Sequence, residues 1–270
     1  GIETITQFFG TALADELASK GILADLLIGN NVLAHVPDIN DFVAGMKRVL
    51  TSTGTITMEF PHLIQMINQN QFDTIYHEHF SYLSLFTVKK IFFQQGLEIY
   101  DVDEISTHGG SLRIYAKHLD DTSKQVSTSV SNLISREKLM GVDTLPYYKG
   151  FNTNVDQIKI DFLSFLIAQK KNGKKVVGYG AAAKGNTLLN YCGVKKDLIS
   201  FVVDANPSKQ GKYLPGSHIP VVCEEQLKKF YPDFVIIFPW NLRVEIMNQL
   251  SYVRDWGGKF IIPIPSVIIE

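Results

Sequence analysis

The sequence has few cysteines, no long apolar run and almost no net charge, and each of these absences excludes a class of protein. Its 270 residues contain two cysteines, Cys192 and Cys223, which by themselves cannot form a disulfide framework or a zinc site. We therefore predict reduced thiols in a cytoplasmic protein. No apolar run reaches the length of a membrane span, and no basic stretch followed by an apolar one begins the chain. The sequence thus predicts neither a membrane helix nor a secretory signal.

The charges are unevenly distributed, although the formal net charge is only −1. Residues 1–115 contain 6 lysines and arginines against 13 acids, whereas residues 116–270 contain 20 against 14. Residues 171–212 hold 8 lysines and only 2 acids. This local positive field favours a small polyanion such as a nucleotide diphosphate, with a solvated lysine-rich face as the alternative. Arginine is scarce and no aromatics alternate with the lysines, so we predict no nucleic-acid partner.

Helical and strand patterns alternate along the chain and predict an α/β protein with two sheets. Strands of the first sheet are expected at residues 24–29, 55–60, 97–102 and 111–116, the last two as an antiparallel edge. Strands of the second are expected at residues 175–179, 199–204, 219–222, 233–238 and 259–263. We assign residues 1–118 to a first α/β unit, 119–172 to a helical connector and 173–270 to a second, Rossmann-like unit.

The segment Tyr76–His79 places two imidazoles, a carboxylate and a phenol in four consecutive residues. It follows the predicted strand 55–60, and α/β folds carry their chemistry in the segments after strands. A neutral imidazole can act as a general base near neutral pH, and a neighbouring carboxylate can orient it. A polar cluster without a catalytic role is the alternative. A zinc site is not predicted, because no third ligand accompanies the two histidines.

Three further segments combine polar side chains with strand ends or glycines. Asn30–His35 follows the predicted strand 24–29, and His108–Arg113 contains a Gly109-Gly110 pair that allows close backbone approach to a ligand or a tight hairpin turn. Gly178–Gly185 lies between a strand and a helix, which is the setting for phosphate binding at a helix N-terminus. Its spacing departs from a dinucleotide fingerprint because position 183 is alanine, so a packing turn remains the alternative.

Taken together, these four segments resemble the sugar C-methyltransferases, which transfer a methyl group from S-adenosylmethionine to a carbon of a nucleoside-diphosphate keto-deoxysugar. The resemblance covers nearly the whole chain and implies a cytoplasmic enzyme of deoxysugar biosynthesis. It implies that His79 is the general base, that Tyr76 and Glu78 assist it, and that His35 steadies a developing enolate. It further implies a sugar pocket lined by the loop with His108, Gly109 and Gly110, and a C-terminal domain that serves as a platform for the substrate nucleotide. We take Asn30 and Asn31 as candidates for cofactor contacts, and Lys184, Asn206 and Lys209 as candidates for diphosphate contacts.

The chain departs from that family in what it lacks. It shows neither the glycine-rich first turn and ribose-binding acid of a methyltransferase domain nor the family's four-cysteine zinc module. We therefore expect a fragment, comprising the second half of the methyltransferase domain and the whole C-terminal domain, with an incomplete S-adenosylmethionine pocket. A naturally shortened protein is the alternative. Two other functions stay open: an NAD(P)-dependent oxidoreductase built on the glycine loop and Asp204, and a non-catalytic sugar-nucleotide-binding module.

Overall fold

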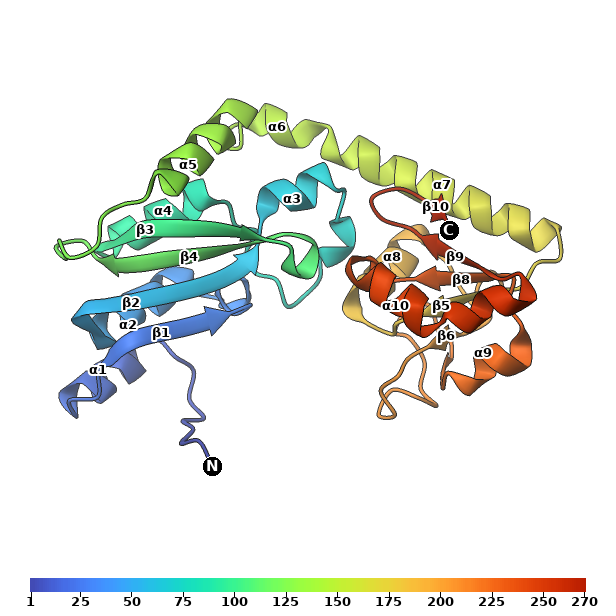
Figure 1. Ribbon diagram of the computed structural model, residues 1–270, viewed down its shortest axis with the longest axis horizontal. Helices are drawn as coiled ribbons and strands as arrows, with labels where there is room; N and C mark the ends of the chain where they lie inside the picture. The colour runs from blue at the N-terminus through green and yellow to red at the C-terminus, as the bar shows by residue number, and fades with distance from the viewer. The chain divides into compact units, whose positions relative to one another are not determined.

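The computed structural model describes all 270 residues, which form two compact units (Figure 1). The first unit comprises residues 1–66 and 77–148, and the second comprises residues 67–76 and 149–270. The short segment 67–76 is therefore part of the second unit, although the chain on both sides of it belongs to the first. No helix is both long and apolar enough to span a membrane.

The first unit is built on a four-stranded mixed sheet in the order β1-β2-β4-β3. Its strands are β1 (Ala24–Asn30), β2 (Leu50–Pro61), β3 (Leu97–Ile105) and β4 (Ser111–His118). β1 and β2 are parallel, whereas β4 runs antiparallel to both β2 and β3. Its helices are α1 (Thr11–Ser19), α2 (Ile39–Val49), α3 (Leu63–Asn68), α4 (Leu85–Gln94), α5 (Thr128–Met140) and α6 (Leu145–Lys149), of which α3 and α6 end in the second unit. The expected antiparallel edge pair is confirmed.

Local signals in the sequence define the ends of these elements. The Asp38 side chain accepts a hydrogen bond from the Asp41 amide and begins α2, and Ser84 caps α4 in the same way. The end of α5 is marked by Gly141, which adopts a left-handed conformation with φ of 80°. Alternating residues of β2 and β4 then build the core, with side chains that are at most 2% exposed: Ile56, Met58, Phe60, Leu112, Ile114 and Ala116.

β1 is an edge strand with one free side (Figure 1). It pairs with β2 and with no other strand. Two of its apolar side chains, Leu26 and Ile28, are 54% and 66% exposed. An open strand edge with exposed apolar side chains is unusual in a natural sheet, because it invites pairing with further strands.

The second unit contains a six-stranded sheet in the order β10-β9-β8-β5-β6-β7. Its strands are β5 (Val176–Tyr179), β6 (Val202–Val203), β7 (Val221–Val222), β8 (Phe234–Ile237), β9 (Lys259–Ile262) and β10 (Ile268–Ile269). All neighbouring strands are parallel except β10, which is antiparallel to β9. The helices are α7 (Phe151–Lys171), α8 (Ala183–Cys192), α9 (Glu225–Phe230) and α10 (Arg243–Gln249). The strand order reverses between β5 and β8, as in a doubly wound nucleotide-binding sheet.

These two sheets confirm the predicted α/β class with a second Rossmann-like unit. The structure differs from the sequence prediction in the short elements. β6 covers only Val202–Val203 instead of residues 199–204, because only these two residues pair with both neighbouring strands. α3 and β10 were not expected, since six and two residues are too few to show a period.

Candidate active site

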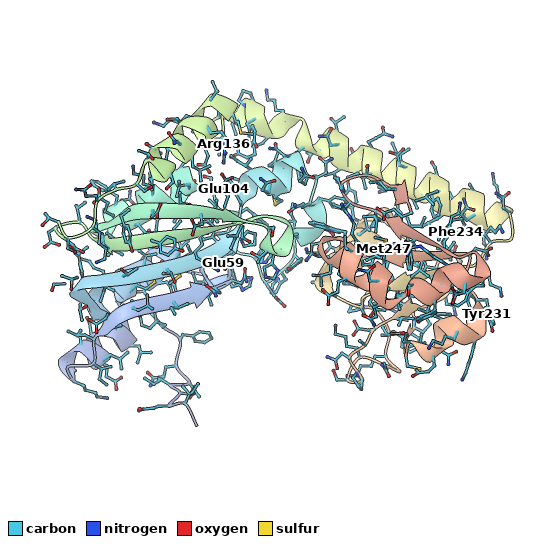
Figure 2. All side chains as sticks on the ribbon, in the orientation of Figure 1. Glu59, Glu104, Arg136, Tyr231, Phe234 and Met247 are labelled. Atoms are coloured by element: carbon cyan, nitrogen blue, oxygen red, sulfur yellow. The ribbon has the colours of Figure 1, made fainter.

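Glu59 is a buried carboxylate at the C-terminal end of β2 (Figure 2). In the sheet it lies between Asn30 of β1 and Arg113 of β4, and it is 5% exposed. Thr107 Oγ1 donates to its Oε1 at 2.8 Å, and Arg113 Nη2 donates to its Oε2 at 2.9 Å. Burial is the largest single effect and raises the pKa of Glu59, but the two hydrogen bonds and the nearby positive charge together outweigh it and hold the pKa below its usual range. The strand end therefore carries a fixed negative charge.

The loop between β3 and β4 meets the loop after β1 at this carboxylate. Asn31 Nδ2 lies 3.0 Å from His108 Nε2, and the Asn31 amide donates to the Glu59 carbonyl at 2.8 Å. Because an amide nitrogen only donates, His108 Nε2 is the acceptor. Gly110 has φ of 114°, and a Cβ there would lie 2.6 Å from Gln65 Cγ. The sequence-predicted Asn31, His108 and Gly110 thus converge on one strand end.

A second contact joins the loop after β1 to the Tyr76–His79 segment. The rings of His35 and His79 are stacked, with centroids 4.9 Å apart and planes 13° apart. Next to them, the amides of Phe80 and Ser81 both donate to the Ala34 carbonyl, at 2.9 and 3.2 Å. Both imidazoles are half-buried. Two histidines from distant parts of the sequence therefore form one paired site, held by backbone hydrogen bonds on the adjacent residues.

The remaining residues of the Tyr76–His79 segment divide between the two units. Tyr76 is the last residue of the segment that packs with the second unit, and His77 is the first to return to the first unit. His77 and Glu78 are exposed, whereas Tyr76 and His79 are half-buried. The structure thus brings His79 together with His35, and it leaves the expected assistance of Tyr76 and Glu78 as a prediction.

The second unit has its own polar cluster at the point where its strand order reverses. Lys184 follows β5 and donates from Nζ to Asn241 Oδ1, after β8, at 2.8 Å. The same ammonium lies 4.1 Å from the centroid of the Trp240 ring. Trp240 Nε1 in turn donates to Asp73 Oδ2 at 2.7 Å. These four side chains bridge the carboxyl ends of β5 and β8, where sheets of this kind bind ligands.

Asp73 is the most buried charge-bearing group of this cluster. It is 1% exposed, and its Oδ1 has no hydrogen-bond partner. Burial raises its pKa to about 6, against the opposing effects of the Trp240 hydrogen bond and the Lys184 charge. Burial also lowers the pKa of Lys184, and the charge of Asp73 opposes that change.

Asp204, where a dinucleotide fold would bind a ribose, instead builds its own loop. Its carboxylate accepts the amides of Ala181 and Asn206, both at 2.8 Å, and the Lys209 ammonium at 3.1 Å. Asn206 Oδ1 accepts the Ser208 amide at 2.9 Å. Of the three predicted diphosphate contacts, Asn206 and Lys209 are therefore engaged within one loop, and Lys184 lies in the cluster described above.

Comparison with known proteins identifies the family of this chain. Residues 106–265 match a family model described as the C-methyltransferase C-terminal domain. The chain belongs to this C-methyltransferase family. It is 35% identical over 266 residues to C-methyltransferase NovU of Streptomyces niveus. That match includes 98% of this chain and 63% of NovU, so the chain spans less than two-thirds of the relative's length.

Two solved structures match parts of the chain with low identity and low TM-scores. Magnesium protoporphyrin IX methyltransferase from Synechocystis PCC 6803, with bound SAH, is 16% identical with a TM-score of 0.29, over 37% of this chain and 47% of that one. M1.HpyAVI in complex with SAM is 8% identical with a TM-score of 0.27, over 43% of this chain and 55% of that one.

Sequence reasoning did not identify Glu59 and Asp73, the buried acids of these two clusters. Glu59 interrupts the apolar strand that ends at Pro61, and a lone acid near a strand end is the signal that identifies it. Asp73 has no comparable signal, because its partner Trp240 is 167 positions away in the chain.

Proposed function

We propose that this C-methyltransferase chain carries the sugar-facing part of an enzyme that methylates a carbon of a nucleoside-diphosphate keto-deoxysugar, with His79 as the general base. The observation that carries this proposal is the stacking of His79 on His35 at 4.9 Å. Methylation of a carbon beside a ketone needs a base for the acidic C–H and a hydrogen-bond donor for the ketone oxygen. Two adjacent imidazoles from separate segments supply both functions.

These two side chains would divide the proton transfer and the stabilisation of the ketone oxygen between them. The neutral His79 ring takes the proton from the sugar carbon, and the electron pair of the broken C–H bond becomes available for attack on a methyl group. His35, beside it, donates a hydrogen bond to the ketone oxygen as negative charge develops there. At the neighbouring strand end, the Glu59 carboxylate is held in place by Thr107 and Arg113.

Asn30 and Asn31 are the residues of this chain that would contact S-adenosylmethionine, which supplies the methyl group as an electrophile. Both lie at the C-terminal end of β1, where a carboxamide can bond to polar groups of the cofactor. β1 presents these polar side chains at its end, and no strand pairs with its other side. The residues fit part of a cofactor site, and the free edge, with Leu26 and Ile28 exposed, supports completion of that site by further strands.

We assign the nucleotide diphosphate to the second unit. The N-cap residue of α8, Ala182, makes no side-chain hydrogen bond, so the first-turn amides of this ten-residue helix have no capping side chain. Lys184 lies in that turn and contacts Asn241 and Trp240 with no ion pair. Asn206 and Lys209, from the next strand-end loop, are the further candidates. An NAD(P) site has less support, because both Asp204 oxygens already accept hydrogen bonds.

The test replaces His79 by alanine in a protein extended by the part that the longer relative has and this chain lacks. His79→Ala should lower kcat for methyl transfer to a nucleoside-diphosphate keto-deoxysugar by about 10²–10⁴-fold. Solvent deuterium exchange at the acidic sugar carbon should fall with it. His77→Ala, two positions away and exposed, is the matched control and should leave both rates unchanged. A normal rate of deuterium exchange in His79→Ala would contradict the role of His79. If the extended parent protein binds the sugar nucleotide but does not methylate it, the non-catalytic binding module is favoured instead.

A further inference from the structure

The loop between β2 and α4 has its two ends fastened together. His62 and Leu83 form an isolated parallel bridge, and the Leu63 amide donates to the Leu83 carbonyl at 2.9 Å. Between these ends the chain enters the second unit at residues 67–76 and then passes through His79. The positions of the loop ends therefore limit where His79 can lie.

Glu137 of α5 forms hydrogen bonds with His62 at one end of this loop and with the first turn of α4 just after the other end. Its Oε1 lies 3.0 Å from His62 Nε2 and accepts the Leu85 amide at 2.9 Å, while its Oε2 accepts the Phe86 amide at 2.6 Å. Leu85 and Phe86 open α4, where amides have no partner within the helix and favour a negative charge. Because a carboxylate only accepts, the His62 ring donates its Nε2–H to Glu137.

The His62–Glu137 pair is fully enclosed. His62 is 2% exposed and Glu137 is 0% exposed, and no lysine or arginine pairs with Glu137. Burial foremost, and then the charge of Glu137, raises the pKa of Tyr148. The nearby Tyr147 has its pKa raised first by burial, then by Tyr148 and Glu137. A buried carboxylate of this kind depends on its hydrogen bonds, so removing one of its donors is costly.

We propose that His62 and Glu137 are positioning residues that hold the ends of the loop so that His79 stays stacked on His35. The catalytic significance rests on the proposed function, because the loop matters for methyl transfer only if His79 is the base. Only the short stretch from His79 to Leu83 separates the stacked ring from the fastened end. The same stretch contains the Phe80 and Ser81 amides that bind the Ala34 carbonyl. Loosening the loop ends should therefore loosen those two amides.

Three substitutions separate the hydrogen bond from the shape of the side chain. Glu137→Gln keeps the shape, but its amide nitrogen cannot accept, so one of the three donors is left unpaired. His62→Leu removes the donor, whereas His62→Gln places an amide nitrogen near the position of Nε2 and keeps it. Arg136→Gln is the matched control. Arg136 precedes Glu137 in α5, and its substitution removes only an exposed ion pair with Glu104 of β3 (Figure 2).

Hydrogen exchange measured on this 270-residue chain tests the proposal without any assay of activity. In Glu137→Gln and His62→Leu, the amides of Phe80 and Ser81 should exchange about tenfold faster or more, as expected for the loss of a hydrogen bond to a charged group. His62→Gln and Arg136→Gln should match the parent chain. Faster exchange at Leu85 and Phe86 alone, with Phe80 and Ser81 unchanged, would overturn the proposal, because the pair would then act only on α4.

Kinetics in the extended protein distinguish this proposal from the proposed function. His62→Leu should lower kcat with little change in KM, and His62→Gln should restore it. If His79→Ala leaves kcat normal while the exchange results hold, the catalytic assignment fails and the positioning of the loop stands. If His79→Ala is inactive but His62→Leu leaves both the Phe80 and Ser81 exchange and kcat unchanged, the positioning role fails.

Discussion

Replacing Asp73 by asparagine should remove a pH dependence from the stability of the second unit. Asp73 is buried, and the pKa of its carboxyl is raised from an ordinary value of 3.8 to about 6 in the folded protein. The folded state therefore binds a proton more tightly than the unfolded state does. Stability from this group is fully present below pH 4 and is lost as the pH rises through 6. Asparagine cannot ionise, and its carbonyl can still accept the Trp240 Nε1–H.

The size of the effect follows from the two pKa values. A shift from 3.8 to about 6 corresponds to about 3 kcal/mol between the limits, at 1.36 kcal/mol for each pKa unit. Between pH 4 and pH 7 the free energy of unfolding of the parent chain should fall by about 2.4 kcal/mol relative to Asp73→Asn, because the unfolded carboxyl is already partly ionised at pH 4. Asp73→Asn should consequently be the more stable protein at neutral pH.

Urea unfolding at a series of pH values measures this difference. The only two tryptophans, Trp240 and Trp256, both lie in the second unit, so their fluorescence reports the unfolding of that unit. Asp197→Asn, on an exposed position of the same unit, is the matched control and should leave the profile of the parent chain unchanged. Parallel profiles for Asp73→Asn and the parent chain would refute the reasoning, because they would mean that Asp73 titrates alike in the folded and unfolded states.

Two further predictions concern one charged group in each unit. Glu59→Gln should destabilise the first unit by about 1.5–3 kcal/mol at pH 7, as expected for a lost hydrogen bond between the carboxylate and Arg113. Because the pKa of Glu59 is lowered in the folded protein, the difference in stability between Glu59→Gln and the parent chain should vanish as the pH falls below that pKa. Urea unfolding at several pH values measures this difference, with Glu104→Gln as an exposed control. Lys184→Ala should weaken the binding of uridine diphosphate by about 1.5–3 kcal/mol in calorimetry. Equal weakening by Lys195→Ala, an exposed lysine, would instead indicate a diffuse field.

Much of the fold can be predicted from local pattern because its elements have local causes. The Asp38 cap begins α2, and the buried apolar face behind it continues to Val49. The sequence predicts only in part which residues come together at the candidate site. Strand-end loops predict the neighbourhood of Asn31 and His108, whereas the burial of Glu59 depends on its register between β1 and β4. Nothing near Asp73 indicates a partner in another part of the chain, because that contact exists only after the second sheet has formed.

The placement of residues 67–76 has a consequence for dividing or recombining this protein. A piece that begins at residue 149 would omit Phe72, whose ring lies 5.1 Å from that of Tyr191, and would leave Trp240 Nε1 without its acceptor. A cut between residues 76 and 149 thus separates two parts of the second unit. A hybrid that exchanges C-terminal halves between relatives must therefore also exchange residues 67–76, because the second unit is encoded by two separate stretches of the sequence.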